Sequence, residues 1–258
     1  MNRLNMLFEK KSGRILSIFF TAGHPQLNST MEIIYALEDA GADMVEIGMP
    51  YSDPVADGSV IQASSKKALE NGMSLRVLFD QLRPVRQRVK MPILLMGYLN
   101  PVLQYGFEKF CSDAAEVGVD GLILPDMPPE IYVEQFRDAM IKAGLHPVFL
   151  ISPETSDDRI RTIDQLSETF IYMVSSPSVT GERLQENPEI KRYFERVCAL
   201  KLTRPRLVGF GISDPHQVEW VSEYAQGVII GSAFIAQLDQ GEALTDTIHK
   251  FLGPFKAT

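Results

Sequence analysis

A single carboxylate stands inside an apolar stretch of the sequence. Glu46 is flanked by Val45 and Ile47 within residues 44–48, a run typical of a buried strand. Burying an unpaired carboxylate costs free energy, so Glu46 needs either a partner that satisfies it or a chemical task that uses a shifted pKa. Because it lies near the end of a strand, we favour general acid–base chemistry and keep a structural role, with a partner arginine or a backbone amide, as the alternative.

Two aspartates follow in the long loop after this strand. Asp53 and Asp57 lie within residues 52–58, and an aspartate before proline or glycine is by itself a common turn residue. Two of them in one loop beside a buried glutamate are less ordinary. The carboxylates form no compact cluster and the four histidines lack metal-ligand spacing, so we expect no metal.

Glycines mark the ends of the last predicted strands. Gly211 follows the seventh, Gly231 and Ser232 follow the eighth, and Gly181 ends the long loop after the sixth. Glycine lets backbone N–H groups approach an anion, and a helix that starts at Ser232 would add a partial positive charge and a hydroxyl donor. The pattern predicts a phosphate site, with simple tight turns as the alternative.

No lysine falls at the C-terminal end of a predicted strand. A Schiff-base aldolase needs an activated lysine in that position. We therefore expect any carbon–carbon chemistry in this chain to use acids and bases alone.

These residues must be positioned by an alternation of short apolar runs and longer amphipathic segments. The runs predict strands at residues 15–20, 44–48, 93–96, 121–124, 147–151, 170–174, 206–210 and 227–230. Three stripes with helical spacing lie between them: Met31, Ile34, Leu37 and Ala40; Phe107, Phe110, Ala114 and Val117; and Val133, Phe136 and Met140.

Eight strand–helix units without a break in composition predict a (β/α)₈ TIM barrel of class α/β, formed by residues 1–258 as a single domain. The active site is then expected at the C-terminal ends of the strands. An open doubly wound sheet is the alternative, but no GxGxxG follows the first strand.

Composition limits the class of protein further. The chain has 258 residues, 45% of them hydrophobic, and a net charge of 25 − 33 = −8, which argues against a nucleic-acid binder. No apolar run is long enough for a membrane span, and the first residues lack the apolar core of a signal peptide. We expect a cytoplasmic protein whose two cysteines are reduced.

Residues 45–58 closely resemble the signature of the tryptophan synthase α-chain family, including the loop Ser-Asp-Pro-x-Ala-Asp-Gly at residues 52–58. The resemblance extends along essentially the whole chain. Further segments similar to the family, in the same order, lie at residues 20–23, 96–101, 124–128, 179–181, 209–213 and 230–233.

The resemblance implies an enzyme, a lyase that cleaves indole-3-glycerol phosphate to indole and glyceraldehyde 3-phosphate in tryptophan biosynthesis. By match to the family, Glu46 would act as general acid and base, and Asp57 would stabilise the positive charge that develops on the indole nitrogen. The resemblance also implies contacts to the indole from Phe19, Met96, Tyr172 and Phe210, and contacts to the phosphate from Gly181, Gly211, Gly231 and Ser232.

Two further features follow from the resemblance. The loop around Thr180 resembles the mobile lid of the family, but Ser176-Pro177-Ser178 stands where many members carry an arginine and a glycine. The family α-chain works in an α2β2 assembly with a β-chain that carries pyridoxal phosphate, so no cofactor is expected in this chain. Residues 50–57 and the Asn100-Pro101 region would face that partner.

Two other functions remain as alternatives. One is a different phosphate-binding TIM-barrel enzyme, such as an isomerase, which the intact Glu46 loop and the absence of a strand-end lysine disfavour. The other is a non-catalytic regulatory subunit, which the presence of both Glu46 and Asp57 disfavours.

Overall fold

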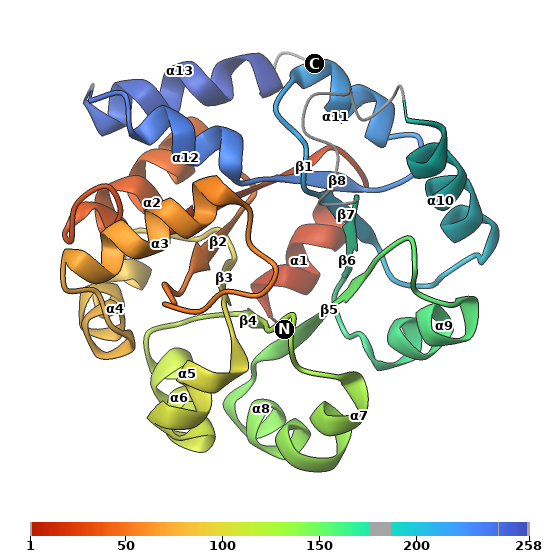
Figure 1. The fold of residues 1–258 in the computed structure, drawn as a ribbon, viewed down its shortest axis with the longest axis horizontal. Coiled ribbons are helices and arrows are strands. Elements are labelled where there is room, and N and C mark those ends of the chain that lie inside the picture. Colours follow the sequence, from red (N-terminus) through yellow and green to blue (C-terminus); the bar gives the residue numbers. More distant parts are fainter. Residues whose placement is uncertain (1, 176–186, 242, 257–258) are drawn as a thin grey trace.

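The protein is described here by a computed structural model that covers residues 2–175, 187–241 and 243–256. Its eight parallel strands pair in sequence order, and β8 pairs with β1 to close the barrel. Figure 1 shows the strands at the centre and the helices in a ring around them. The predicted (β/α)₈ barrel is therefore confirmed.

The strands lie close to their predicted positions. They are β1 Ile15–Thr21, β2 Met44–Gly48, β3 Ile93–Met96, β4 Gly121–Ile123, β5 His146–Ile151, β6 Ile171–Val174, β7 Arg206–Gly209 and β8 Gly227–Ile230. Three have the predicted bounds, and the other five differ by one residue at one end. This agreement reflects strands that are buried on both faces, which the sequence marks with uninterrupted apolar runs.

The helices fill the intervals between the strands. They are α1 Arg3–Lys10, α2 Ser29–Ala40, α3 Ser59–Glu70, α4 Leu75–Leu82, α5 Leu99–Tyr105, α6 Phe107–Glu116, α7 Pro129–Ile131, α8 Arg137–Ala143, α9 Asp157–Leu166, α10 Pro188–Ala199, α11 Pro215–Val221, α12 Ser232–Leu238 and α13 Leu244–Lys256. A 3₁₀ turn at Val85–Gln87 (η1) and a π-helix at Tyr132–Phe136 (η2) complete them. None of the described helices is both long and apolar enough to span a membrane.

Each strand supplies two separate hydrophobic layers. On β2, Val45 and Ile47 belong to the layer between the strands and the helices, whereas Met44 belongs to the layer inside the barrel. Glu46 alternates with Val45 and Ile47 and therefore shares the inner face with Met44. In the register of the sheet it lies between Phe19 of β1 and Leu94 of β3, so this carboxylate is placed in the barrel interior.

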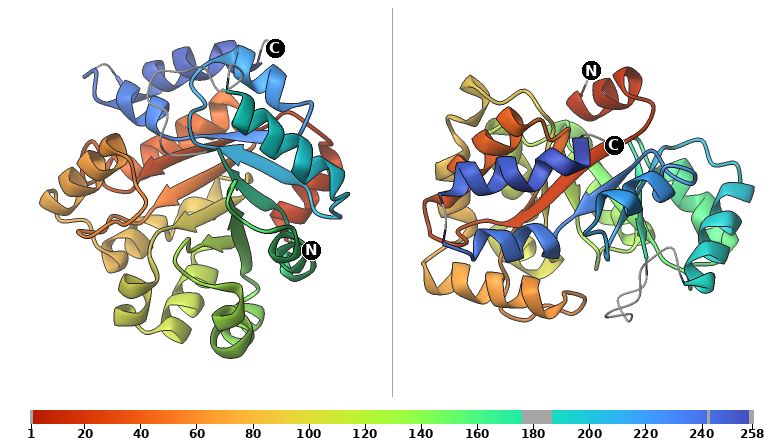
Figure 2. Two further views of the ribbon diagram at one scale, coloured as in Figure 1. Left: turned by 45° about the vertical axis from the view of Figure 1, so that its right-hand side comes forward. Right: turned by 90° about the horizontal axis from the view of Figure 1, so that it is seen from above.

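The N-terminal helix closes one end of the barrel. Leu4 on α1 is fully buried within the interior layer, and Phe8 packs on Phe170 with ring centroids 5.5 Å apart. The Asn2 side chain caps this helix by accepting a hydrogen bond from the Leu4 amide. In the right-hand view of Figure 2, α1 lies at the end of the barrel where the strands begin. The opposite end is therefore the one that holds the expected active site.

One residue of a predicted helical stripe is wrong. Val133 was expected on the buried face with Phe136 and Met140, but its side chain is 44% exposed, and Tyr132 is buried in its place at 1%. The physical reason is the π-helix at Tyr132–Phe136, whose wider turn changes the direction in which successive side chains point. Tyr132 packs edge-on against Phe149 of β5, at 5.4 Å between ring centroids.

Candidate active site

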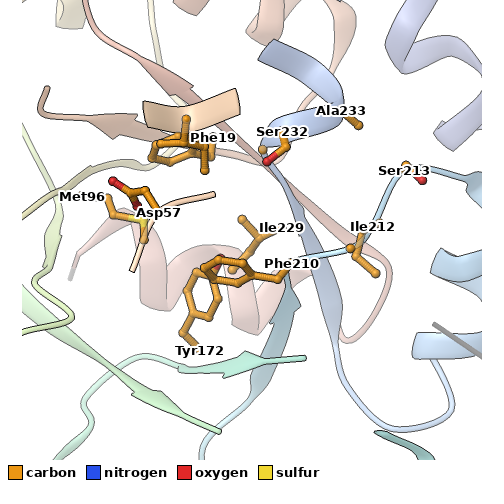
Figure 3. Close-up of a pocket in the computed structure, with 13 residues that line it drawn as sticks. Phe19, Asp57, Met96, Tyr172, Phe210, Ile212, Ser213, Ile229, Ser232 and Ala233 are labelled. Atoms are coloured by element: carbon orange, nitrogen blue, oxygen red, sulfur yellow. The ribbon is translucent and has the colours of Figure 1, made fainter. Parts of the chain in front are cut away.

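A cavity of about 680 Å³, part of it open to solvent, lies at the C-terminal end of the barrel. It is lined by Phe19, Asp57, Ile61, Met96, Tyr172, Phe210, Gly211, Ile212, Ser213, Ile229, Gly231, Ser232 and Ala233. The structure thus gathers eight of the predicted site residues around one space: Phe19, Asp57, Met96, Tyr172, Phe210, Gly211, Gly231 and Ser232. Figure 3 shows Asp57 and Met96 on one side of it and Ser232, Ala233 and Ser213 on the other.

Aromatic and apolar side chains make up much of the lining. Tyr172 of β6 and Phe210, just after β7, meet edge to face with ring centroids 6.1 Å apart. Phe19 of β1 and Met96 of β3 complete this part of the lining. Such a surface suits a flat aromatic ligand, because the rings can contact it by stacked or edge-on packing.

Two glycines make room for this aromatic wall. A Cβ atom on Gly48 would lie 2.6 Å from the Phe19 ring, and one on Gly209 would lie 2.1 Å from the Tyr172 hydroxyl oxygen. Both distances are too short for any side chain. The glycines at the ends of β2 and β7 are therefore required by the positions of Phe19 and Tyr172.

Glu46 is not among the residues that line the cavity, although its register partner Phe19 is. The Glu46 side chain is fully buried, the Ser17 hydroxyl donates a hydrogen bond to Oε1 at 2.8 Å, and Oε2 has no partner among the described residues. Burial raises the pKa of Glu46 to about 8, although the hydrogen bond from Ser17 acts in the opposite direction. Neither an arginine nor a backbone amide satisfies Glu46 in the part of the chain that is described, so the structural alternative for its burial is not supported.

Asp57 is held at the edge of the cavity by Tyr98. The Tyr98 hydroxyl oxygen accepts hydrogen bonds from the amides of Val55 at 3.2 Å and Ala56 at 3.0 Å, and its proton is directed to the Asp57 carboxylate. Partial burial raises the pKa of Asp57, and the hydrogen bond from Tyr98 opposes that change. Tyr98, which is itself 6% exposed, thereby fixes the loop that carries Asp57.

Tyr172 links the two carboxylates electrostatically. Burial raises its pKa well above the usual value, and the negative charges of Glu46 and then Asp57 raise it further. The phenol therefore stays protonated at neutral pH. Both carboxylates therefore lie in the neighbourhood of the same ring.

Backbone amides form the opposite side of the cavity. Gly231 precedes α12, and the amides of the first turn of this helix, beginning at Ser232, have no acceptors within the helix. After β7, Phe210 and Gly211 both have a left-handed backbone, with φ of 71° and 75°. The Ser175 hydroxyl fixes this turn by donating to the Phe210 carbonyl at 2.6 Å. Amide groups at a helix start and in a glycine turn are suited to an oxyanion.

The side chain of Gln217 shapes the turn after β7. It donates to the Gly211 carbonyl at 3.0 Å and accepts from the amides of Ser213 at 2.8 Å and Asp214 at 3.1 Å. The Ser213 and Asp214 amides are therefore already used within the protein. The amides available to a ligand on this side are those nearer to Gly211 and to the start of α12.

Some expected site residues lie outside the described part of the chain. These are Gly181, Thr180 and the segment Ser176-Pro177-Ser178. Within the described residues, no group of three or more histidine, cysteine, aspartate and glutamate side chains could hold a metal ion.

Three positioning residues were not identified from the sequence. Ser17 resembles any small residue in a strand, Tyr98 follows a strand end without a pattern of its own, and Gln217 lies on a helix. Only Tyr98 had a usable signal, because a tyrosine after a barrel strand is placed at the catalytic end. Ser17 and Tyr98 find their partners on a neighbouring strand or loop, whereas Gln217 bonds to the turn just before its own helix.

Comparison with known proteins identifies the family. The family model described as "Tryptophan synthase alpha chain" matches residues 6–253. A tryptophan synthase alpha chain from Flavobacterium johnsoniae is 50% identical over 256 residues, which cover 99% of this chain and 100% of that protein. A relative of the same name from Phocaeicola vulgatus is 48% identical over 95% of both chains.

Solved structures agree with this assignment. The crystal structure of tryptophan synthase subunit alpha from Legionella pneumophila matches with a TM-score of 0.90 at 34% identity, covering 100% of this chain and 98% of that one. A chain from a structure titled for the mutual activation of the tryptophan synthase α2β2 complex of Pyrococcus furiosus matches with a TM-score of 0.87 at 33% identity, covering 94% and 98%. The chain belongs to the tryptophan synthase alpha chain family.

Proposed function

We propose that this chain cleaves indole-3-glycerol phosphate to indole and glyceraldehyde 3-phosphate, with Glu46 as the acid–base residue. The observation that carries this proposal is the fully buried Glu46 with a pKa of about 8, paired in the sheet with Phe19 of a cavity that has an aromatic wall and an amide-lined side. The family of the chain supports the same reaction.

The reaction is a retro-aldol cleavage with two proton transfers. A proton adds to C3 of the indole ring, and the hydroxyl next to that carbon loses its proton as the carbon–carbon bond breaks. The bonding electron pair returns to the ring as indole leaves, and the former hydroxyl carbon becomes the aldehyde of the second product. A carboxyl group with a pKa near neutrality can give one proton and take the other, which is the role of Glu46.

Asp57 serves the other end of the indole. Protonation at C3 places positive charge toward the ring nitrogen, and a carboxylate that accepts the ring N–H stabilises that charge. Its edge position, fixed by Tyr98, suits this role, whereas the deeper burial of Glu46 suits proton transfer. Two acids with different environments can thus divide the work.

The indole and the phosphate of the substrate match the aromatic part and the amide-lined part of the cavity, respectively. The indole would lie among Phe19, Met96, Tyr172 and Phe210, and the phosphate would accept hydrogen bonds from the backbone near Gly211, Gly231 and Ser232. By the resemblance of the sequence, Gly181 would join the phosphate contacts and Thr180 would belong to a lid over the substrate.

The wider setting is also a proposal. Residues 1–258 act as one cytoplasmic domain that needs no cofactor of its own and forms an α2β2 assembly with a β-chain, which carries pyridoxal phosphate and receives the indole. The loop after β2 is suited to contact that partner, since Val55 is 88% exposed. Addition of the cognate β-chain is expected to raise the rate of cleavage.

The direct test is release of indole from indole-3-glycerol phosphate by the purified chain without a partner. Glu46→Gln keeps the shape of the side chain and should lower turnover by about 10²–10⁴-fold, the usual contribution of a general acid–base residue. Glu70→Gln, at an exposed site on α3, is the matched control and should retain full activity. Near-wild-type turnover of Glu46→Gln would remove Glu46 from the mechanism, and no indole from the wild-type chain would favour a regulatory subunit.

A further inference from the structure

A second cavity lies at the other end of the barrel, beside α1. It encloses about 1160 Å³, part of it open to solvent, and is lined by residues before or at the start of β1, β6, β7 and β8. Phe8, Thr169, Arg204, Arg206 and Gln226 are among them. In the right-hand view of Figure 2, α1 marks this end. The proposed cleavage takes place at the opposite end, so it gives this cavity no task.

Two arginines in the wall of this cavity lack ion pairs. Arg204 and Arg206 are half-buried, and neither lies within ion-pair distance of a carboxylate among the described residues. The Nε–H of each is buried without an acceptor, and the Arg206 guanidinium makes only long contacts, at 3.5 Å to the Arg204 carbonyl and 3.4 Å to that of Tyr224. Partial burial of an unpaired positive charge raises the free energy of the folded state, and an anion bound nearby would offset this increase.

Three other charged groups line the cavity. Lys11 pairs with Asp43 at 2.6 Å, Glu168 is hydrogen-bonded to His146 at 2.7 Å, and Glu9 is exposed on α1. Among the described residues of the lining, Arg204 and Arg206 are the two positive charges without an ion pair, and an anion bound between them would be at the part of the cavity where positive charge is concentrated.

The backbone beneath the arginines is fixed in place. The buried Asp164 carboxylate accepts from the Thr203 amide at 3.0 Å, the Thr203 hydroxyl at 2.9 Å and the Arg204 amide at 2.8 Å. The Gln226 side chain accepts from the Arg206 amide at 2.7 Å. Asp164 therefore binds the backbone of Arg204 and forms no ion pair with its guanidinium group. Since this backbone is already fixed, little conformational entropy is lost there when a ligand binds.

We propose that this cavity, the lower anion site (Phe8, Thr169, Arg204, Arg206 and Gln226), binds a phosphate group, either as inorganic phosphate or in a small phosphate ester. Guanidinium groups match the geometry of phosphate oxygens, and two of them suit a dianion better than the single charge of a carboxylate. Phe8 offers an apolar surface beside them for the organic part of an ester.

The test is a titration of the full chain with inorganic phosphate, followed residue by residue through backbone amide NMR shifts. The amides of Arg204, Arg206 and Gln226 should shift with a saturable curve. The amides of Gly231 and Ser232 report separately on the proposed substrate site, so binding at the two ends of the barrel is distinguished. Failure at one end leaves the proposal for the other end intact.

Variants assign the binding to the arginines. Arg204→Gln and Arg206→Gln should each weaken phosphate binding at the lower anion site about tenfold or more, because each removes charge-assisted hydrogen bonds. Arg192→Gln, at an exposed site on α10, is the matched control and should bind normally. Thermal unfolding checks each fold, and Arg204→Gln alone suffices if Arg206→Gln is destabilised.

Three results would overturn the proposal. The first is the absence of saturable shifts near Arg204 in the wild-type chain. The second is unchanged affinity in a folded Arg204→Gln variant. The third is equal or tighter binding of succinate in place of phosphate, which would show a general carboxylate site.

Discussion

The hydroxyl of Ser17 donates a hydrogen bond of 2.8 Å to Oε1 of Glu46 across the interior of the barrel. Ser17 is two residues before Phe19, the register partner of Glu46, so both side chains share the inner face of the sheet. The hydrogen bond favours the ionised carboxylate, whereas burial favours the protonated one, and burial has the larger effect. Two opposing effects therefore set the pKa of Glu46 at about 8.

Removing this hydrogen bond should move the pH profile of the enzyme. In Ser17→Ala the ionised form of Glu46 loses its donor, so its pKa should rise above about 8, by roughly one unit if the bond is worth about 1–1.5 kcal/mol. We expect the midpoint of the pH dependence of kcat/KM that belongs to Glu46 to move upward by that amount. Ser222→Ala, at an exposed site, is the control, and a midpoint that stays in place or falls would contradict the assignment.

The buried carboxyl group also makes stability depend on pH. Its pKa is about 8 in the folded chain, against 4.5 for a glutamate side chain in water, so between these values the folded state binds more protons than the unfolded state. The stabilising contribution is complete below about pH 4.5 and is lost as pH rises through 8, at about 1.4 kcal/mol per pH unit.

Glu46→Gln should therefore become more stable relative to the wild type as pH rises. Urea unfolding at intervals from pH 5 to 9 should show the difference in free energy of unfolding growing by a few kcal/mol and levelling off above about pH 8. Glu70→Gln should show no such trend. Parallel curves for Glu46→Gln and the wild type would mean that the pKa of Glu46 is not raised.

The barrel could be predicted because each of its strands is marked by a short stretch of sequence. Strands such as 44–48 are buried on both faces and stand out as apolar runs between glycine and proline loops, and Glu46 is conspicuous within one of them. Most residues of the cavity could also be predicted, because they follow the strands and the C-terminal ends of all strands meet at one end of a closed barrel.

The features that the sequence did not predict depend on contacts with other elements of the fold. The helix α1 precedes the first strand, and its position is fixed because Leu4 fills the end of the closed barrel. The π-helix at Tyr132–Phe136 shifts its buried face to meet Phe149 of another element. The task of Ser17 exists only because β2 brings Glu46 beside it.

Tyr98→Phe should weaken catalysis through Asp57. The change removes the oxygen that accepts from the Val55 and Ala56 amides and the proton directed to Asp57, so the carboxylate loses its fixed position. Loss of these hydrogen bonds should lower kcat/KM about tenfold or more while the fold remains. Tyr35→Phe, on α2, is the matched control. If Tyr98→Phe and Tyr35→Phe retain equal activity, Tyr98 does not position Asp57.

Gly209→Ala should damage the cavity and the stability together. The new Cβ would lie 2.1 Å from the Tyr172 hydroxyl oxygen, so the ring must move away from the indole position. We expect a loss of about 1–3 kcal/mol in the free energy of unfolding from overpacking, and a higher KM for the substrate. Gly253→Ala is the matched control because it meets no atom within 4 Å, and it should be neutral or slightly stabilising in its helix.

The clash with Tyr172 can be isolated by a double-mutant cycle. If overlap with that ring is the cause, Gly209→Ala should cost little when Tyr172→Ala has already removed the ring. Urea unfolding of the four proteins measures the coupling, which should favour the double variant by at least about 1 kcal/mol. Simple additivity of the two changes would show that Gly209 is needed for another reason, such as the backbone of the turn that follows β7.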